Sequence, residues 1–402
     1  MNRRIQTIGL VAAAILAIGA GILAYMMVNS YLWGNGSQPN SNTGPSTPTA
    51  SQGCGVTKTG GSYTFSWLHI SRGYFVDDKN CIVNLKGFNW AQLEFGNGVG
   101  GGPKTRISAD ALAWYSQTFH TNVWRIPVNA VWWNQDVEVP LANMKYQDWI
   151  QQIVKWAEEN GNYIILTKGP QFPNPPCGGG VKVCPSQNQG KKNFDLGLAG
   201  PDELTSGQYI QPAVTMWTSI AKRYSDDPAV LYDSWNEMNA IDAQTWYRNT
   251  NTLIETIRAQ NPRSVIFLGG PDFKGDINPI IQRAVPDFAQ SNLVYDFHVY
   301  DGFKGTYLGK NCNSPLGYLW QSWPNHANEQ VSFSQHQGKA VAFSEWGGCN
   351  DFADYNQAIT SYARTYHICL AYYDQVNVAT KTSSGYQITD NGLRVQAAYA
   401  TL

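Results

Sequence analysis

The stretch between Asn122 and Lys168 decides the fold of this chain. It reads NVWRIPV at Asn122–Val128, YQDWIQQIVKWAEE at Tyr146–Glu159 and YIILTK at Tyr163–Lys168. The first and last runs are short, apolar and rich in β-branched and aromatic residues, as buried strands are, and the middle run has apolar residues at helical spacing. This order predicts two parallel strands joined by a helix.

The same alternation continues in both directions along the chain. Further amphipathic segments are Gly207–Tyr224, Ala243–Gln260 and Tyr355–Thr365, and Ser108 with Asp110 is typical of a helix start. The strand candidates are Ile82–Trp90, Asn122–Val128, Tyr163–Lys168, Val230–Asn236, Ser264–Leu268, Leu293–Tyr300, Ala340–Trp346 and Cys369–Val376. Eight strands alternating with helices predict an α/β protein with a (β/α)8 TIM barrel.

An open, doubly wound sheet is the alternative architecture. It usually carries a glycine-rich phosphate turn after its first strand. Here the first strand candidate runs into GFNWAQLEFGNG, which lacks the G-x-G-x-x-G spacing, so the barrel is favoured.

The first fifty residues predict a membrane anchor and a tether. Residues 1–30 contain the basic Arg3 and Arg4 followed by an uncharged run from Ile8 to Val28, long enough for a transmembrane helix with the rest of the chain outside the cell. A cleaved signal peptide, and hence secretion, is the alternative. Residues 31–53 are rich in Ser, Thr, Pro, Asn and Gly and predict a flexible linker, which leaves 54–402 as a catalytic barrel domain.

Composition narrows the range of partners. The net charge of −1 gives no indication of nucleic-acid binding, and we expect a monomer. Charged residues make up only 14% of the chain, whereas there are 15 Trp and 22 Tyr. Trp132, Trp133, Trp320 and Trp323 fall in predicted loops, where flat rings can stack on sugars; a large aromatic core is the other interpretation.

Seven cysteines favour an oxidising environment. Cys177 and Cys184 bracket the loop CGGGVKVC and predict a disulfide, although a zinc site is the alternative. The other possible pairs are Cys54 with Cys81 and Cys312 with Cys349, which leaves Cys369 in an apolar run.

Two carboxylates terminate strands on opposite sides of the predicted barrel. Glu237 follows Trp235-Asn236, and Glu345 follows Phe343-Ser344. A single Glu after a strand is often only a helix-start feature, but barrel enzymes carry their reactive groups at these strand ends. Two facing carboxylates suit cleavage of a glycosidic bond, in which one acts as an acid and the other as a nucleophile or base.

Other polar residues at strand ends support this interpretation. Arg125 closes the second strand and could hold a carboxylate ionised, while His298 and Tyr300 alternate at the end of the sixth so that both can face inward. Asn236 could bond a sugar 2-hydroxyl. The alternative for Arg125 and His298 is a satisfied polar network in the core.

The motifs LKGFNW, NVWRIPV, YDSWNEMN, DFHVY and AFSEWGG, in that order, closely resemble glycoside hydrolase family 5 and its barrel clan, from about Cys81 to the C-terminus. The resemblance implies a retaining mechanism without metal or cofactor, with Glu237 as acid/base and Glu345 as nucleophile. It also implies that Asn236 contacts the 2-hydroxyl. The residues expected to orient the nucleophile are Arg125, His298 and Tyr300.

The expected substrate is a β-linked polysaccharide cut internally, with β-1,4-glucan favoured and β-mannan or xylan as alternatives. A non-catalytic carbohydrate-binding protein at the cell surface is the alternative of another class. The aromatic residues assigned to substrate binding are Trp90, Trp132, Trp320, Trp346 and Tyr373.

Two positions depart from the pattern of the family. Members usually have a His at the end of strand three, where this chain has Lys168, with Gln171 shortly after it. They also usually have a Trp at the end of strand eight, where this chain has Tyr372 and Tyr373. These differences bear on the substrate rather than on the class of reaction.

Overall fold

The computed structural model describes residues 54–90, 107–139, 142–169, 207, 209–300, 305–307, 310–312, 325–347, 353–373 and 375–402. Within these ranges the predicted barrel is present, closed, and parallel throughout. Its strands, in chain order, are β5 (Lys86–Asn89), β6 (Val123–Val128), β9 (Tyr163–Lys168), β10 (Val230–Asp233), β11 (Ile266–Leu268), β12 (Leu293–Tyr300), β15 (Ala340–Gly347) and β16 (Cys369–Tyr372). Each coincides with one of the eight predicted segments, and β15 alone extends beyond its segment, by the single residue Gly347, so the prediction of a barrel is confirmed.

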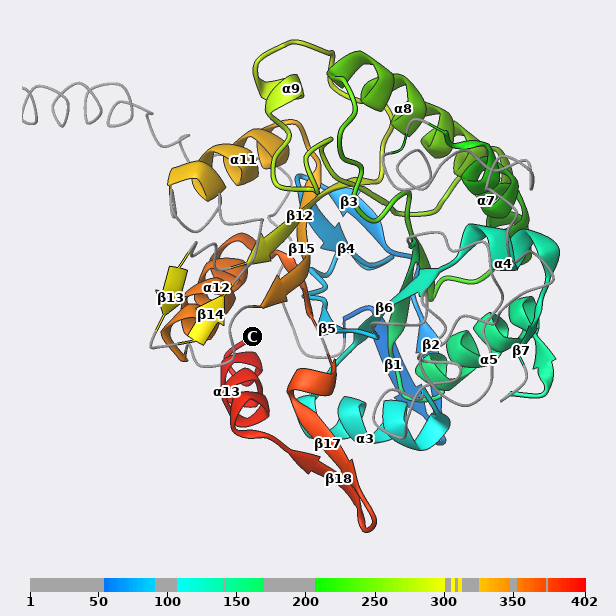
Figure 1. The fold of residues 1–402 in the computed structure, drawn as a ribbon, viewed down its shortest axis with the longest axis vertical. Coiled ribbons are helices and arrows are strands. Elements are labelled where there is room, and N and C mark those ends of the chain that lie inside the picture. Colours follow the sequence, from blue (N-terminus) through cyan, green and yellow to red (C-terminus); the bar gives the residue numbers. More distant parts are fainter. Residues whose placement is uncertain are drawn as a thin grey trace, which may run out of the picture. The chain divides into compact units, whose positions relative to one another are not determined.

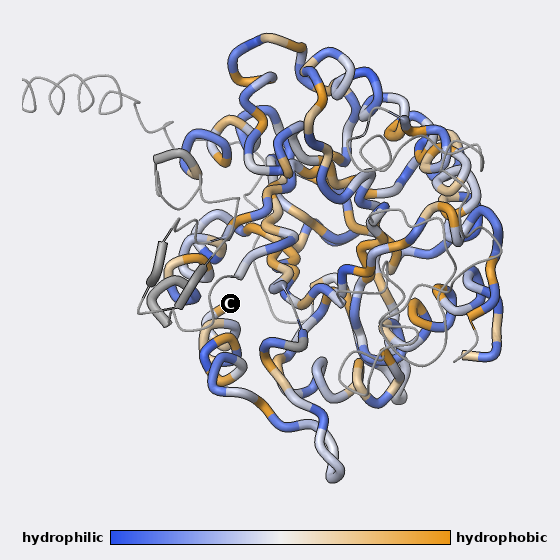
Figure 2. Tube along the Cα trace, in the orientation of Figure 1, coloured by the Kyte–Doolittle hydropathy of each residue, from blue (hydrophilic) through white to orange (hydrophobic). Residues whose placement is uncertain are grey.

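Helices surround the strands and cover their outer faces (Figure 1). They are α3 (Ala109–Phe119), α4 (Ala130–Gln135), α5 (Tyr146–Glu158), α7 (Gln211–Arg223), α8 (Ala243–Gln260), α9 (Asn278–Ile281), α11 (Asn325–His336), α12 (Ala353–Tyr366) and α13 (Asp390–Tyr399). The helix start predicted at Ser108 is confirmed, because its side chain accepts a hydrogen bond from the Ala111 N–H. Figure 2 shows apolar residues concentrated on the inner strands and polar residues on the outer helices.

Small two-stranded hairpins form separate sheets outside the barrel. They pair β1 (Val56–Thr59) with β2 (Ser62–Phe65), β3 (His69–Ser71) with β4 (Tyr74–Val76), β7 (Glu138–Val139) with β8 (Met144–Lys145), β13 (Gly305–Tyr307) with β14 (Lys310–Cys312) and β17 (Ala379–Thr382) with β18 (Gly385–Ile388). Leu68 and Phe75, next to and within the β3–β4 hairpin, pack against the inward residues of the barrel strands, such as Val123 and Phe267. The hairpin therefore closes the apolar end of the barrel interior.

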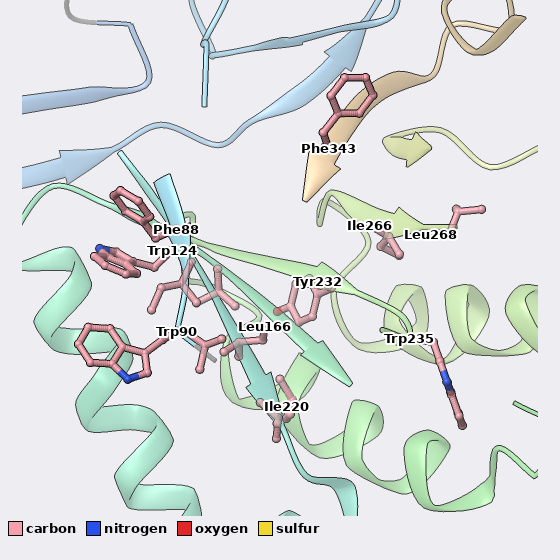
Figure 3. Packing of buried hydrophobic residues seen from close by; sticks show 14 of the residues in the cluster. Phe88, Trp90, Trp124, Leu166, Ile220, Tyr232, Trp235, Ile266, Leu268 and Phe343 are labelled. Atoms are coloured by element: carbon pink, nitrogen blue, oxygen red, sulfur yellow. The ribbon is translucent and has the colours of Figure 1, made fainter. Parts of the chain in front are cut away.

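The larger apolar cluster lies between strands and helices. Phe88, Trp90 and Trp124 group together there, with their ring centroids 5.5–5.8 Å apart in the pairs that involve Trp124 (Figure 3). Aromatic pairs at such separations add to the stabilisation that burial alone provides. Much of the high aromatic content is thus used in the core.

The loop interpretation of Trp132 and Trp133 is wrong. Both lie on α4, which is capped by the Asn129 side chain, and both are fully buried. The Asn129 cap starts a helix directly after β6, a signal that the apolar run AVWW concealed.

The cysteine predictions have different outcomes. Cys54 and Cys81 form a disulfide, as predicted, and Cys369 is a free, buried cysteine on β16. Cys177, Cys184 and Cys349 lie outside the described residues, so the pairs predicted for them stay predictions.

The predicted anchor and linker, residues 1–53, also lie outside the described residues. Among the residues that are described, no helix is both long and apolar enough to span a bilayer.

The carboxyl groups of Glu158, at the end of α5, and Asp227, after α7, form a pair that makes the stability of the fold depend on pH. Burial and the neighbouring Asp227 carboxylate raise the pKa of Glu158 from 4.5 to about 8. Because its folded pKa lies above its unfolded value, the native state gains stability as the pH falls from about 8 to 4.5, with no further gain below that. We expect Glu158→Gln to raise the melting temperature at pH 8, with the difference from wild type closing towards pH 4.5 in calorimetric scans. A difference that widens towards acid pH would contradict this.

Candidate active site

The carboxyl ends of the barrel strands hold a layer of buried polar side chains. Because strand residues alternate between faces, Val123 on β6 packs in the apolar interior and Arg125 follows two residues later on the same face. The same alternation places Asp233 on β10 and Asp296 on β12 above apolar inward residues. All three polar side chains are at most 2% exposed.

A bulge on β15 brings its carboxylate into this layer. Asp296 and His298 on β12 face Ala342 and Glu345, so β15 spans three residues where β12 spans two. The pairing with β16 shows the same extra residue between Phe343 and Trp346. A bulge of this kind redirects side chains, and it lets the consecutive Ser344 and Glu345 both contact groups of the polar layer.

Arg125 is the central cation of the layer. Its Nη1 donates to Glu345 Oε1 at 2.6 Å and to Asn89 Oδ1 at 2.8 Å. Its Nη2 donates to Asp233 Oδ2 at 2.8 Å and to Asn236 Oδ1 at 2.7 Å. Burial disfavours its charge, but the carboxylates of Asp233 and Glu345 outweigh burial and raise the pKa of Arg125. Arg125 is therefore a permanent cation that fixes Glu345 and Asn236 together.

Glu345 accepts a second hydrogen bond from Tyr300, whose Oη lies 2.6 Å from Oε2. Burial and the Glu345 charge raise the pKa of Tyr300 well above its usual value, so the phenol remains a donor. Two donors on its two oxygens stabilise the anionic form of Glu345 and fix its orientation.

Glu237 has a different environment from Glu345. Its Oε1 lies 2.6 Å from His298 Nδ1, and 26% of its side chain is exposed, compared with 9% for Glu345. Partial burial and the nearby Glu345 charge raise the pKa of Glu237 to about 8. The two carboxyl groups each place an oxygen within 4.8 Å of one another and of a His298 nitrogen. Glu237 thus holds its proton at neutral pH beside Glu345, whose two oxygens accept hydrogen bonds from Arg125 and Tyr300.

The residues predicted to orient the nucleophile divide between the two carboxyls. Arg125 and Tyr300 contact Glu345, as expected. His298 instead bonds Glu237, and its Nδ1 lies 3.5 Å from Glu345 Oε2.

A buried lysine, which the sequence analysis missed, links the carboxylates below the site. Lys274 Nζ lies 2.7 Å from Asp233 Oδ1 and 2.5 Å from Asp296 Oδ2. Asp296 could have been found from the sequence, because it precedes His298 by two positions on the inward face of β12, and Asp233 is the polar residue that closes the apolar run of β10. Lys274 could not, because it sits in the segment after β11 with a left-handed backbone, φ 58°.

A pocket of about 350 Å³ opens beside Glu237. Its lining residues are Lys168, Gly169, Trp235, Asn236, Glu237, Asn239 and Phe273. The Lys168 ammonium lies 3.3 Å from the centre of the Trp235 ring, and burial lowers the pKa of Lys168 well below its usual value. Lys168 thus lies beside the site, where the family usually has a His. Gln171 lies outside the described residues.

Tyr373 is the partly exposed aromatic residue near the nucleophile. Its ring centroid is 6.2 Å from that of Tyr300, edge-on. Tyr372 points the other way, because it is buried against Trp346 and its hydroxyl accepts a hydrogen bond from Asn391. Of the two candidates for the strand-eight position, only Tyr373 is placed to meet a sugar.

Three of the predicted sugar-binding tryptophans are buried in the core instead. Trp90 packs on Tyr115 and Trp124, Trp132 packs on Tyr146, and Trp346 packs on Tyr372 and Tyr399. Each is at most 1% exposed and offers no face to a sugar, so these assignments are wrong. The alternation of strand side chains explains why Trp90 and Trp346 face the core between strands and helices, since their neighbours Asn89 and Glu345 face inward. Trp320 lies outside the described residues.

Among the described residues, two groups have the composition of a metal site. In the first, Cys54 and Cys81 are joined as a disulfide beside Asp77. In the second, Glu237, His298 and Glu345 are engaged in hydrogen bonds with one another, Arg125 and Tyr300. We assign a metal to neither group.

Known relatives share this arrangement of strands. A β-glucanase of Saccharophagus degradans in complex with cellotetraose aligns with a TM-score of 0.59 at 17% identity, over 90% of this chain and 98% of that one. The catalytic domain of a Thermobifida fusca endoglucanase in complex with cellotetraose aligns with a TM-score of 0.56 at 15% identity, over 83% and 97% of the two chains. At these identities the likeness shows the fold.

Curated protein sequences and a family model also match this chain. Endoglucanase 5 of Pectobacterium carotovorum subsp. carotovorum is 22% identical over 289 residues, which are 71% of this chain and 44% of the relative. Endoglucanase N of Pectobacterium atrosepticum is also 22% identical over 289 residues, which are 50% of its length. The match thus spans about half the length of these curated relatives. Residues 76–377 match the family described as Cellulase (glycosyl hydrolase family 5), and this chain therefore belongs to that family.

Proposed function

We propose that this protein is a retaining, internally cutting β-1,4-glucanase, with Glu237 as acid/base and Glu345 as nucleophile. The observation that carries the proposal is the pair of carboxyls with oxygens within 4.8 Å of one another but in opposite environments. Retaining glycosidases place their carboxyls about 5–5.5 Å apart, whereas inverting enzymes need about 6.5–9.5 Å to admit a water molecule.

In the first step Glu237 donates its proton to the glycosidic oxygen while Glu345 attacks the anomeric carbon. The raised pKa of Glu237, about 8, keeps it protonated at neutral pH until the leaving group needs the proton. Arg125 and Tyr300 hold the Glu345 oxygens in place for attack. The bond to the leaving sugar breaks as the bond from Glu345 to the anomeric carbon forms.

In the second step the ionised Glu237 takes a proton from water, and the hydroxide oxygen displaces Glu345 from the sugar. Two inversions give net retention. Asn236 supports both steps: because its Oδ1 accepts from Arg125, its amide nitrogen is the donor available to the sugar 2-hydroxyl.

The substrate assignment rests on the relatives. The matched curated proteins are named endoglucanases, and both cited structures hold cellotetraose. The partly exposed ring of Tyr373 and the pocket beside Glu237 offer surfaces on which a glucan chain can lie.

The test is reducing-end release by the full chain from carboxymethyl-cellulose, β-mannan and xylan, alongside Glu237→Gln and Glu345→Gln. We expect activity on carboxymethyl-cellulose that both substitutions abolish. Activity on mannan or xylan alone would keep the mechanism and refute the substrate. Binding to glucan without hydrolysis of any polymer would refute the proposal in favour of a carbohydrate-binding role.

We further propose that the barrel works outside the cell as a monomer held to the membrane by the segment Ile8–Val28. The uncharged run and its preceding arginines support this, and the Cys54–Cys81 disulfide suits an oxidising compartment. Recovery of the chain in the carbonate-resistant membrane fraction would support an anchor, whereas recovery in the medium would indicate cleavage.

A further inference from the structure

His298 has a hydrogen-bonding partner at each of its ring nitrogens, and one of these partners is Glu237. Nδ1 lies 2.6 Å from Glu237 Oε1, and Nε2 lies 3.4 Å from the Ser344 hydroxyl. The imidazole is fully buried. Which nitrogen carries the proton follows from what its neighbours can accept.

The first link below His298 is the Ser344 hydroxyl. It donates to Asp296 Oδ2 at 2.6 Å, and the Ser344 N–H donates to Asp296 Oδ1 at 3.0 Å. Lys274 Nζ adds a third donor, 2.5 Å from Oδ2. Burial raises the pKa of Asp296 and the Lys274 charge opposes this, and three donors on two oxygens fix the group as an acceptor.

The direction of every bond in the chain then follows. A serine hydroxyl has one proton, and that of Ser344 is given to Asp296, so only a lone pair faces His298 Nε2. This arrangement favours a proton on Nε2. A neutral imidazole has only one N–H, which makes Nδ1 an acceptor, and the short contact at Nδ1 requires a proton on Glu237.

The charges around His298 favour its neutral form. Burial, followed by the positive charges of Lys274 and Arg125, holds the pKa of His298 well below its usual value. The charged and titratable groups around His298, Glu237 and the residues that contact them are Arg125 on β6, Lys168 on β9, Asp233 on β10, Lys274 after β11, Asp296 and Tyr300 on β12, Glu345 on β15 and Cys369 on β16. Glu345 is the nearest anion, and Arg125 and Tyr300 both bond it.

We propose that Ser344 and Asp296 are positioning residues that hold neutral His298 with its proton on Nε2, so that Nδ1 accepts the proton of Glu237. This rests on the proposed role of Glu237 as acid/base. The hydrogen-bonded series Lys274–Asp296–Ser344–His298 keeps Glu237 protonated in the resting enzyme. After the proton leaves, the Nδ1 lone pair faces an ionised Glu237, which favours recovery of a proton from water in the second step.

The direct test is the tautomer of His298 in the wild-type full chain labelled with ¹⁵N-histidine. His298→Gln identifies its signals by their loss. Between pH 5 and 7 we expect Nε2 to show the shift of a protonated nitrogen and Nδ1 that of an unprotonated one. A proton on Nδ1 alone, or on both nitrogens, would overturn the proposal.

The second test is Ser344→Ala. Without the hydroxyl acceptor, the proton of His298 can move to Nδ1 and donate to an ionised Glu237, which lowers the pKa of that carboxyl. We expect the basic limb of the pH profile of kcat/KM to shift to lower pH by about one unit. KM and the acidic limb should be unchanged.

The matched control is Ser334→Ala. Ser334 is also fully buried, but its hydroxyl bonds only the Gln330 carbonyl within α11 in the described structure, so its profile should match wild type. A basic limb that does not move in Ser344→Ala would count against the proposal. The NMR measurement needs no substrate, so it can succeed even if no glucan is hydrolysed, which separates this proposal from the proposed function.

Discussion

Replacement of Glu345 by Ala should lower kcat on aryl β-cellobiosides by about 10⁴-fold or more, because it removes the atom that attacks the anomeric carbon. The fold should survive this change. Arg125 would keep its bonds to Asp233, Asn89 and Asn236. Steady-state kinetics with circular dichroism as a check on folding would measure the effect.

Azide separates the roles of the two carboxyls. In Glu345→Ala it can enter the vacated space and attack directly, giving an α-glycosyl azide with inverted configuration. In the control Glu237→Ala, azide attacks the glycosyl-enzyme instead of water and gives the β-azide. Exchange of these two products would show that the roles are reversed, and near wild-type activity in Glu345→Ala would refute a nucleophile at this position.

Replacement of Arg125 by Met should destabilise the protein by about 3–5 kcal/mol, because it leaves buried carboxylates without their principal cation. Asp233 would retain Lys274, but Glu345 would retain only Tyr300 and the distant His298 contact. Asn236 and Asn89 would also lose a donor. Urea denaturation of the variant at pH 7 would measure the loss.

Arg263→Met is the control for this change. Arg263 is 56% exposed, lies over the Trp67 ring and is 3.8 Å from Asp226, so its removal should cost at most about 1 kcal/mol. Equal losses in the two variants would contradict the view that Arg125 neutralises the site.

The barrel could be predicted from the sequence because its strands are buried on both faces. Segments such as Tyr163–Lys168 and Leu293–Tyr300 are mostly apolar and buried along nearly their whole length, and their predicted bounds agree with those of β9 and β12. Strand β10 ends at Asp233, three residues before the predicted end, because the backbone bends at Ser234 and again at Asn236.

The site could be predicted where its residues lie at the ends of strands. Glu237, Glu345, Arg125, His298 and Tyr300 come together, although His298 meets the other carboxyl. The bulge at Ser344 and the route of Lys274 into the barrel depend on backbone geometry that no local pattern encodes. The sugar-binding roles predicted for Trp90 and Trp346 were wrong for a related reason. An aromatic residue next to an inward polar residue of a strand faces the helices.

The stereochemistry of hydrolysis tests the central claim most directly. Proton NMR of cello-oligosaccharide hydrolysis, recorded faster than mutarotation, reports the anomer released first. Glu237 and Glu345, with oxygens within 4.8 Å of one another, predict the β-anomer first, with the α-anomer growing in later. Release of the α-anomer first would show single displacement by water and would contradict Glu345 as a nucleophile.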